Sequence, residues 1–392
     1  MEKEKLFTKD FITTSVVNFV LTLSMYLLLV VMATYAIETH AASASMAGFV
    51  ASIFIIGSLC GRLFAGRLIT KLGTKKMLII GTILFLIMTL CYFIPSNLLL
   101  LMAIRLIHGI GFGIATTATG TIVSQVMPAS RGGEGIGYFS LSTVLSTAIG
   151  PLIGIYLMRT QGFESIFVFS FIIGVVSLLL TLFIKPPYII SHVQQTGFKW
   201  SQYFEVRSLP ISLMMFYGAL AYSSILSFIT AYAAEVNLIS AGSLYFLVYA
   251  LIILASRPFT GRIMDIRGGN SIIYPGIILF AIGLVLLSQS TSTLMFLLAA
   301  AIIGLGYGNF QSATQAIAVK AAPKERMGLA NSTYFIFLDL GLGFGPVALG
   351  YLIPTFGYRG VYLGLAAYMV VGIFVYFLLH GRKDKQLLTE TT

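Results

Sequence analysis

Apolar runs long enough to cross a lipid bilayer recur along almost the entire chain, separated by short polar segments. The hydrocarbon core of a bilayer is about 30 Å thick, so a spanning helix needs roughly 20 apolar residues. The runs that reach this length lie at residues 11–37, 45–68, 77–95, 98–124, 135–158, 164–184, 208–233, 240–264, 271–289, 292–318, 329–354 and 360–380. This pattern predicts an all-α membrane protein with twelve transmembrane helices.

The composition agrees with lipid as the main surroundings of the chain. Of its 392 residues, 58% are hydrophobic and only 9% are charged, which is far from the composition of a soluble domain. Cys60 and Cys91 fall within predicted helices 2 and 3, where a small polarizable side chain is common filler. They imply neither a disulfide nor a metal site, and we expect no metal or other cofactor.

The net charge of +11 would suit a nucleic-acid-binding protein, but the positions of the 24 basic residues argue against that class. On the predicted topology, Arg105 is inside a helix and Arg159 and Arg359 face one side, whereas all the others are assigned to the termini or to loops on the opposite side. The positive-inside rule then places both termini in the cytoplasm of a cell-membrane protein. Anionic lipid headgroups are the expected counter-charge, and no nucleic acid is expected as a partner.

An internal repeat is visible at a constant offset of 195 residues. Residues 62–67 (RLFAGR) reappear as residues 257–262 (RPFTGR). Other pairs at this offset are Gly109 and Gly304, Gly111 and Gly306, Gly113 and Gly308, Pro128 and Pro323, Arg131 and Arg326, Gly150 and Gly345, and Pro151 and Pro346. The first helix of each half aligns at an offset of 197, so one external loop is two residues longer than its counterpart. Six helices have therefore been duplicated in parallel.

Two parallel six-helix halves, residues 1–185 and 208–392 with a short cytoplasmic tail, joined by a cytoplasmic linker at 186–207, resemble the major facilitator superfamily. Three motifs carry the resemblance. Residues 66–76 (GRLITKLGTKK) are similar to the family signature between helices 2 and 3, and residues 101–109 (LMAIRLIHG) to its helix 4 motif. Residues 146–154 (STAIGPLIG) are similar to the helix 5 motif of the exporter, or antiporter, branch. The resemblance implies two pseudo-symmetric bundles that transport a solute by alternating access.

The resemblance also implies a gate. In the family, an acidic residue at the fifth position of the helix 2/3 motif makes an ionic contact with the start of helix 11. Thr70 occupies that position here, whereas the second copy keeps the acid as Asp265, so the contact is expected to be weakened in one half. The gating candidates are Gly66, Thr70, Lys71, Gly73, Asp265, Gly150, Pro151, Gly154, Gly345 and Pro346. Two simpler interpretations stay open, namely that the lysines only set topology and that the glycines only allow close helix packing.

Two charged side chains lie well inside the predicted spans, Arg105 and Asp339. Each costs at least ~2.5 kcal/mol at a helix centre, so each should face protein, water or a partner. Their repeat mates are Ala300 and Val144, so the scaffold does not require either charge. Asp339 is the first candidate for a proton carrier, because a carboxylate in a cavity can be loaded and unloaded as the cavity opens to alternate sides.

His108, one turn after Arg105, is a second titratable candidate for proton coupling. For Arg105 the alternatives are substrate contact or a structural hub between helices 1, 4 and 5, and for Asp339 and His108 a fixed, hydrogen-bonded packing role stays open. Helices 1, 4, 7 and 10 line the central cavity in the family. The polar and aromatic residues on these helices therefore form the candidate substrate wall: Arg105, Tyr26, Thr116, Tyr217, Tyr222, Tyr307, Asn309, Gln311 and Gln315. Interhelical hydrogen bonds and aromatic packing are the simpler explanation.

The leading functional hypothesis is a proton-coupled exporter of small amphipathic compounds or drugs. The alternative is a specific metabolite transporter, either an importer or an exporter of an anionic metabolite or siderophore, in which Arg105 pairs with a carboxylate. A membrane enzyme or an ATP-driven pump is disfavoured, since no P-loop pattern and no Ser/His/Asp or His/Glu metal grouping is present. The expected partners are a small-molecule substrate, protons and the lipid bilayer, and the chain is expected to act as a monomer.

Overall fold

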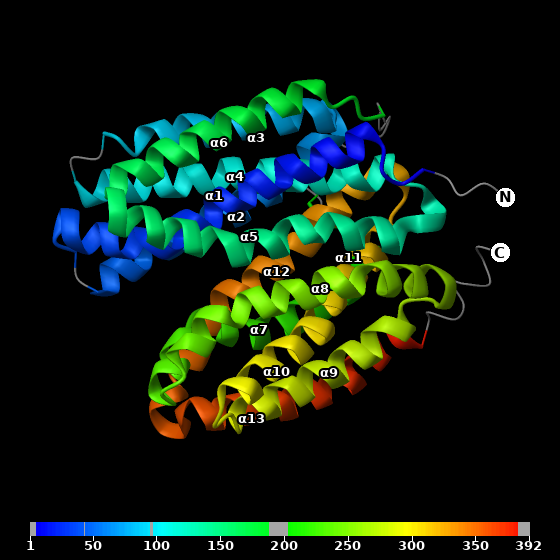
Figure 1. Cartoon of the computed structure of the whole chain (residues 1–392). Helices are drawn as coiled ribbons and strands as arrows, with labels where there is room; N and C mark the ends of the chain where they lie inside the picture. The colour runs from blue at the N-terminus through cyan, green and yellow to red at the C-terminus, as the bar shows by residue number, and fades with distance from the viewer. Residues whose placement is uncertain (1–4, 43, 95–96, 188–202, 383–392) are drawn as a thin grey trace. The chain divides into compact units, whose positions relative to one another are not determined.

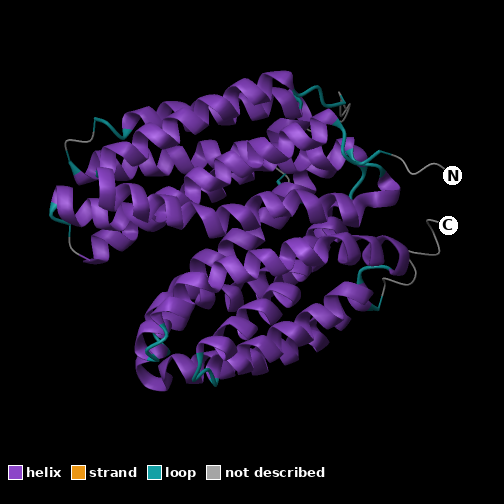
Figure 2. Ribbon diagram, viewed as in Figure 1, coloured by secondary structure: helices purple, strands orange, loops and turns teal. Residues whose placement is uncertain are grey.

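The computed structural model describes residues 5–42, 44–94, 97–187 and 203–382, and this part consists of helices and connecting loops (Figure 2). Twelve of its helical stretches are long and apolar enough to span a membrane, which confirms the predicted number. The helices are α1 Lys9–His40, α2 Ala44–Leu72, α3 Thr74–Cys91, α4 Leu98–Val126, α5 Gly132–Gln161, α6 Phe163–Phe183, α7 Leu209–Glu235, α8 Ile239–Arg267, α9 Asn270–Ser288, α10 Thr293–Ile303, α11 Asn309–Lys320, α12 Met327–Gly350 and α13 Ile353–Tyr376. Short 3-10 turns are η1 Ala129–Arg131, η3 Val206–Ser208 and η5 Lys324–Arg326, and π-helical segments are η4 Gly304–Gly308 and η6 Phe377–Gly381.

The helices group into two compact units that differ from a simple division of the sequence. Unit 1 contains Met1–Pro128, Ser142–Val206 and Ala322–Ile336, and unit 2 contains Ala129–Leu141, Arg207–Ala321 and Phe337–Thr392. Helices α5 and α12 therefore each begin in one unit and continue in the other. The predicted linker and tail lie largely outside the described residues, at 188–202 and 383–392, so the division into domains stays a prediction.

Within unit 1, α4 packs against α1, α2 and α3, and α6 contacts α1 and α3 (Figure 1). Glycines allow this close packing. A side chain at Gly109 would collide with the carbonyl oxygen of Phe54 on α2, and one at Gly111 would meet the backbone of Phe85 on α3. The glycine repeat thus places the backbone of α4 directly against both neighbours.

Unit 2 repeats these contacts at the same offset. A side chain at Gly304 would meet the backbone of Tyr249 on α8, and one at Gly306 would meet the backbone of Phe280 on α9. Tyr249 and Phe280 lie 195 residues after the two phenylalanines that face the glycines of unit 1. The repeat in the sequence is therefore also a repeat of helix contacts.

Helix starts follow the same repeat. The Asn97 side chain caps α4 by accepting a hydrogen bond from the amide of Leu100 at 2.9 Å. Ser292, 195 residues later, caps α10 by accepting from the amide of Met295 at 3.3 Å. These side chains satisfy amides that have no partner inside the helix.

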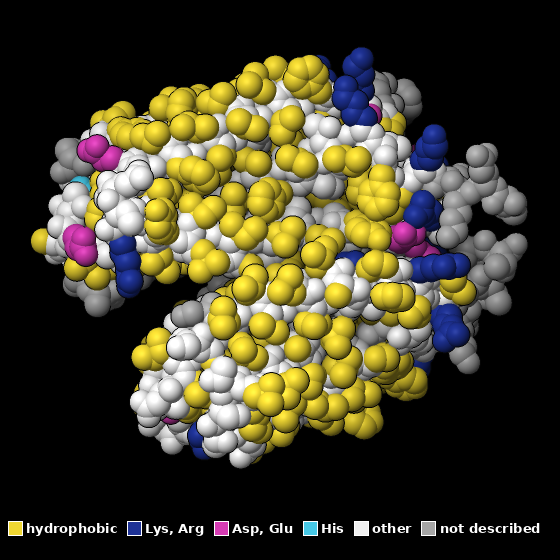
Figure 3. All heavy atoms as spheres, in the orientation of Figure 1, with side chains coloured by type: hydrophobic (Ala, Val, Ile, Leu, Met, Phe, Trp, Pro, Cys, Tyr) yellow, Lys and Arg dark blue, Asp and Glu magenta, His cyan; other side chains and the backbone are white. Residues whose placement is uncertain are grey.

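Large apolar side chains cover the outward faces of the helices, as the space-filling view shows (Figure 3). Leu99, Phe183 and Phe374, on α4, α6 and α13, are 74%, 60% and 68% exposed. So many exposed apolar groups would be unfavourable in water but suit a lipid environment.

Candidate functional site

Arg105 lies in the interior of unit 1, between α4 and α2. Its side chain is fully buried, and its Nε donates to the carbonyl oxygen of Val50 at 3.2 Å. Its guanidinium group also lies over the ring of Phe54, 4.8 Å from the ring centre. Both contacts hold the guanidinium group against α2 and are stabilising in a low-dielectric interior.

His108 has hydrogen-bond partners at both ring nitrogens. Nδ1 shares a hydrogen bond of 2.9 Å with the hydroxyl of Tyr92, and Nε2 lies 3.3 Å from the hydroxyl of Thr89. The imidazole is fully buried and packs against the ring of Phe85 at 4.1 Å. This environment suits a side chain that joins α3 to α4.

Two further buried arginines correct the sequence-based assignment of charge. Arg62 of α2 is 4% exposed, donates to the hydroxyl of Thr116 at 3.1 Å and lies 4.7 Å from the centre of the Phe335 ring. On the predicted topology it was placed among the loop residues that set the orientation in the membrane. A long basic side chain close to a helix end can instead be buried where its charged group donates to neutral oxygens and lies over aromatic rings.

Arg257 of α8, the repeat mate of Arg62, is 2% exposed and was also counted with the loop residues. Its Nη2 donates to the hydroxyl of Ser140 at 2.7 Å and to the carbonyl oxygen of Gly308 at 3.1 Å. Its Nη1 donates to the hydroxyl of Ser312 and, at 3.4 Å, to the side-chain oxygen of Asn309. Each repeat therefore buries an arginine of its second helix against a neighbouring helix.

The tenth predicted span is not a regular α-helix, because the π-helical segment η4 separates α10 from α11. A π-turn has more residues than an α-turn, so it rotates the side chains that follow, and such segments are frequent at functional sites. The segment holds Tyr307, which is buried and stacks on Tyr222 of α7 with ring centres 3.9 Å apart. Tyr222 also stacks on Tyr249 of α8 at 5.6 Å, so three helices of unit 2 meet at a tyrosine cluster.

The structure does not bring all predicted substrate residues to that cluster. Asn309 faces α8, since it donates to the hydroxyl of Ser256 at 3.1 Å. Tyr217 instead stacks on Tyr368 of α13, with ring centres 3.8 Å apart, and donates to the carbonyl oxygen of the same residue. Gln315 is buried, whereas the remaining two candidates, Gln311 and Tyr26, are half-buried.

Asp339 is half-buried in the second part of α12, which belongs to unit 2. Two residues later, a side chain at Gly341 would meet the carbonyl oxygen of Phe216 on α7. The acid thus lies on a spanning helix, beside a close contact between α12 and α7.

The motif residues of predicted helices 5 and 11, which are α5 and α12 in the structure, pack on the first helix of their own half. In unit 1, Gly150 and Gly154 approach the backbone of Leu27 on α1. In unit 2, Gly345 approaches Ser223 and the carbonyl oxygen of Leu220 on α7. Pro151 and Pro346 lie inside α5 and α12, where each removes a backbone hydrogen-bond donor.

Asp265 joins the end of α8 to the start of α5 within unit 2. Its Oδ1 accepts a hydrogen bond from the amide of Gly133 at 2.6 Å, and its Oδ2 accepts from the amide of Glu134 at 2.9 Å. A carboxylate at a helix N-terminus is stabilised by the free amides and by the helix dipole. We call this contact the α8/α5 junction.

The equivalent contact in unit 1, the α2/α12 junction, has no such bond from Thr70. The hydroxyl of Thr70 donates to the carbonyl oxygen of Arg67 in its own helix at 2.7 Å. The two helices still approach closely, because Gly66 and Gly328 have no side chains at the contact. A side chain at Gly66 would collide with Ser332, and one at Gly328 would collide with Ile69. The α2/α12 junction therefore depends on close packing at glycines, without a hydrogen bond from Thr70 across it.

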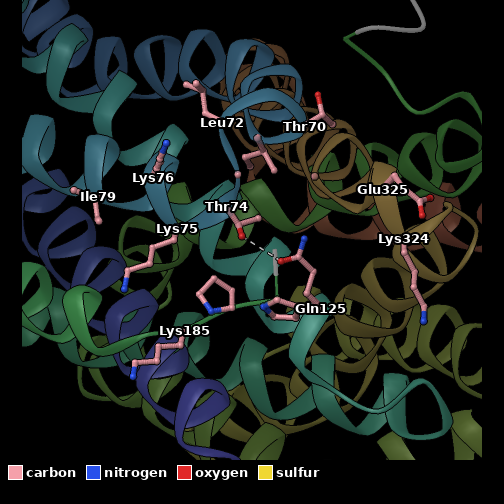
Figure 4. Close-up of a pocket in the computed structure, with 15 residues that line it drawn as sticks. Thr70, Leu72, Thr74, Lys75, Lys76, Ile79, Gln125, Lys185, Lys324 and Glu325 are labelled. Carbon is pink, nitrogen blue, oxygen red and sulfur yellow. Dashed lines mark hydrogen bonds between the residues drawn. The ribbon is translucent and has the colours of Figure 1, made fainter. Parts of the chain in front are cut away.

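A cavity of about 490 Å³ opens beside this junction, between the α2/α3 turn and the start of α12. Lys75 and Lys185 line one side of it and Lys324 and Glu325 the other (Figure 4). Figure 4 also shows Thr74 pointing toward Gln125, to whose side-chain oxygen it donates at 3.2 Å. Thr70, Lys76 and Gly73 are further lining residues, whereas Lys71 is exposed and outside the lining.

A family model described as Major Facilitator Superfamily matches residues 14–277 and 236–391. The chain belongs to the Major Facilitator Superfamily. It is therefore a multi-pass secondary transporter rather than an enzyme, as the sequence predicted. Among the described residues, no group of three or more His, Cys, Asp or Glu side chains could hold a metal ion.

Relatives of this major facilitator carry the family name without a named substrate. The chain is 27% identical over 358 residues to an uncharacterized MFS-type transporter of Methanocaldococcus jannaschii, with 88% of this chain and 92% of that protein covered. It is 25% identical over 354 residues to an uncharacterized MFS-type transporter of Burkholderia pseudomallei, with 88% and 85% covered.

Two solved structures share the fold. The human organic anion transporter MFSD10 (TETRAN) matches with a TM-score of 0.78 and 13% identity, over 94% of this chain and 98% of that one. The proton:xylose symporter XylE bound to 6-bromo-6-deoxy-D-glucose matches with a TM-score of 0.73 and 13% identity, over 94% of each chain. At this identity the likeness concerns the major facilitator fold alone.

The interior of this major facilitator also holds a polar network around Asn18 that was not among the predicted site residues. Asn18 of α1 is 3% exposed, donates to the hydroxyl of Ser142 at 2.7 Å and accepts from the hydroxyl of Thr119 at 2.9 Å. Ser146, at a position where the family usually has glycine, shares a hydrogen bond of 2.7 Å with Thr22 of α1. An amide inside predicted helix 1 was the available signal for this network.

Proposed function

We propose that the chain is a proton-coupled exporter of small amphipathic compounds that works by alternating access in the cell membrane as a monomer, with both termini in the cytoplasm. The observation that carries this proposal is the half-buried carboxylate of Asp339 within a spanning helix. Such a group is costly in a membrane and is retained mainly where ions, protons or substrates pass. Its repeat mate is Val144, so the duplicated scaffold folds without an acid at this place.

Proton coupling is assigned to Asp339 in preference to His108. The imidazole of His108 is fully buried, and its nitrogens already have partners in Thr89 of α3 and in Tyr92 directly after α3. A proton carrier has to exchange its proton with water during the cycle. A half-buried carboxylate meets that requirement more readily than an imidazole enclosed among aromatic rings.

The direction and the substrate class rest on two other features. Export is supported by the resemblance of residues 146–154 to the helix 5 motif of the exporter branch, and the glycines of this motif bring α5 against α1. An amphipathic substrate is supported by the stacked rings of Tyr222 and Tyr307, which combine apolar faces with hydroxyl groups. The basic residues outside the spans support the cytoplasmic placement of the termini.

The test is transport by purified protein in proteoliposomes with an imposed pH gradient, with a lipophilic cationic dye as substrate. Asp339→Asn is expected to abolish uptake driven by the gradient while dye exchange without a gradient continues. The matched control is Glu38→Gln, which removes an exposed carboxylate at the end of α1. Unchanged gradient-driven uptake by Asp339→Asn would refute the assignment.

A specific transporter of an anionic metabolite is the second candidate, and the buried guanidinium groups favour it. Arg257 donates to the hydroxyl groups of Ser140 and Ser312, which are neutral acceptors that a substrate carboxylate could replace. MFSD10, which shares the fold, is an organic anion transporter. Proton flux driven by a carboxylate-rich compound, without movement of the cationic dye, would favour this candidate over the exporter.

A further inference from the structure

The two junctions defined above are repeat mates with different chemistry. At the α8/α5 junction, Asp265 binds two amides at the start of α5, and Arg131 in the preceding turn forms an ion pair of 2.8 Å with Glu134. At the α2/α12 junction, the corresponding positions are Thr70, Arg326 and Leu329. Both acids of the α8/α5 junction are therefore replaced, whereas the arginine is kept.

Arg326, the retained arginine, pairs with an acid from another segment of unit 1. The guanidinium group of Arg326 forms an ion pair with the carboxylate of Glu205, which is 3% exposed and lies in the segment that leads into α7. The backbone amide of Glu205 donates to the hydroxyl of Thr333 on α12 at 2.9 Å. Glu205 thus contacts η5, directly before α12, through its side chain, and α12 through its backbone.

The same segment also contacts α2. The hydroxyl of Tyr203 accepts a hydrogen bond from Arg67 at 2.6 Å, and the guanidinium group of Arg67 lies 5.1 Å from the centre of the Tyr203 ring. All of these residues belong to unit 1. The segment Tyr203, Phe204 and Glu205 therefore connects the end of α2 to the start of α12.

We propose that Glu205 supplies the carboxylate that Thr70 lacks, and that residues 203–205 form a clasp that holds the first turns of α12 against α2. The role is that of a positioning residue for transport. The proposal depends on membership of the transporter family and is independent of the substrate or the coupling ion.

The clasp has a direct physical consequence for the transport cycle. Movement of the first turns of α12 away from α2 has to break either the contacts of Glu205 with Arg326 and Thr333 or the contact of Tyr203 with Arg67. Breaking an ion pair with a buried partner is unfavourable unless water reaches both groups. The clasp therefore favours the state in which the α2/α12 junction is closed, and residues 203–205 set the strength of that preference.

The test measures opening of the junction by the labelling rate of a single cysteine. Cys60 and Cys91, the two native cysteines, are replaced by serine, and Ala330→Cys introduces a probe at a fully buried position of α12. Glu205→Gln in the reconstituted full chain is expected to increase the rate of labelling by a soluble maleimide about tenfold, because a neutral hydrogen bond replaces a charge-assisted one. Glu325→Gln, which removes an exposed acid beside Arg326, is the matched control and should change the rate by less than about twofold.

A rescue variant distinguishes replacement of the missing acid from general loss of structure. Thr70→Asp places a carboxylate at the position equivalent to Asp265, which binds the amides of Gly133 and Glu134 in the other repeat, and the repeat mates of those two residues are Gly328 and Leu329 at the start of α12. Combined with Glu205→Gln, it should return the labelling rate to that of the parent. An unchanged rate in Glu205→Gln, an equal increase in Glu325→Gln, or failure of Thr70→Asp to reverse the increase would each overturn the proposal.

Discussion

The α8/α5 junction allows a quantitative prediction for Asp265→Asn. The carboxylate accepts two amide hydrogen bonds, at 2.6 and 2.9 Å, whereas an asparagine has a single oxygen acceptor. One amide at the start of α5 then faces an NH2 group, and leaving it unsatisfied costs about 1–3 kcal/mol. Loss of the negative charge at the helix N-terminus adds about 0.3–1 kcal/mol. The junction is therefore expected to weaken by about 1.3–4 kcal/mol in total, which corresponds to a factor of roughly 10–700 in its opening equilibrium.

The assay is again the labelling of a single cysteine, now Ile136→Cys, which replaces a fully buried side chain of α5. When closing is faster than the chemical reaction, the labelling rate is proportional to the open population. Asp10→Asn removes an acid from the first turn of α1 in unit 1 and should leave the rate unchanged. A rate for Asp265→Asn within about twofold of the parent would refute the reasoning, because it would mean that the two amide bonds contribute almost no stability.

Two further predictions concern the interior of unit 1. Gly109→Ala pushes a methyl group against the carbonyl oxygen of Phe54, and we expect it to destabilise the fold by about 1–3 kcal/mol, seen as a lower thermal unfolding midpoint; Gly364→Ala, which has nothing within 4 Å of the added carbon atom, is the control, and equal midpoints would contradict the packing argument. His108→Phe removes the ring nitrogen that shares a hydrogen bond with the buried Tyr92 hydroxyl and should cost about 1–3 kcal/mol of stability without altering the pH profile of transport in proteoliposomes; a shifted profile would return His108 to the role of proton carrier.

The fold was predictable from the sequence because its two main signals are long. Twelve apolar runs each carry enough residues to define a span, and the offset of 195 residues is supported by many pairs. The repeat even anticipates contacts: Gly109 meets Phe54, and Gly304 meets Tyr249 at the same offset. Periodicity, length and repetition are collective properties that single unusual residues do not obscure.

The candidate site was less predictable because it depends on individual side chains and on local backbone geometry. The π-helical segment η4 changes the face on which Tyr307 and the residues after it lie, and apolar periodicity contains no signal for it. Arg62 and Arg257 were grouped with loop charges, although a repeat that keeps an arginine at both positions was visible. The contact of Glu205 with Arg326 joins residues 121 positions apart in the sequence, and no local pattern indicates such a pair.

Each unit contains a helical segment encoded in the other half of the gene: residues 322–336 belong to unit 1, and residues 129–141 belong to unit 2. A gene divided within the linker would therefore give two polypeptides, neither of which contains all the segments of a unit. During synthesis, the first six helices leave the ribosome well before the segment that completes their unit. Unit 1 can reach its final packing only after residue 336 has been made, so maturation of the amino-terminal half has to wait for the carboxyl-terminal half.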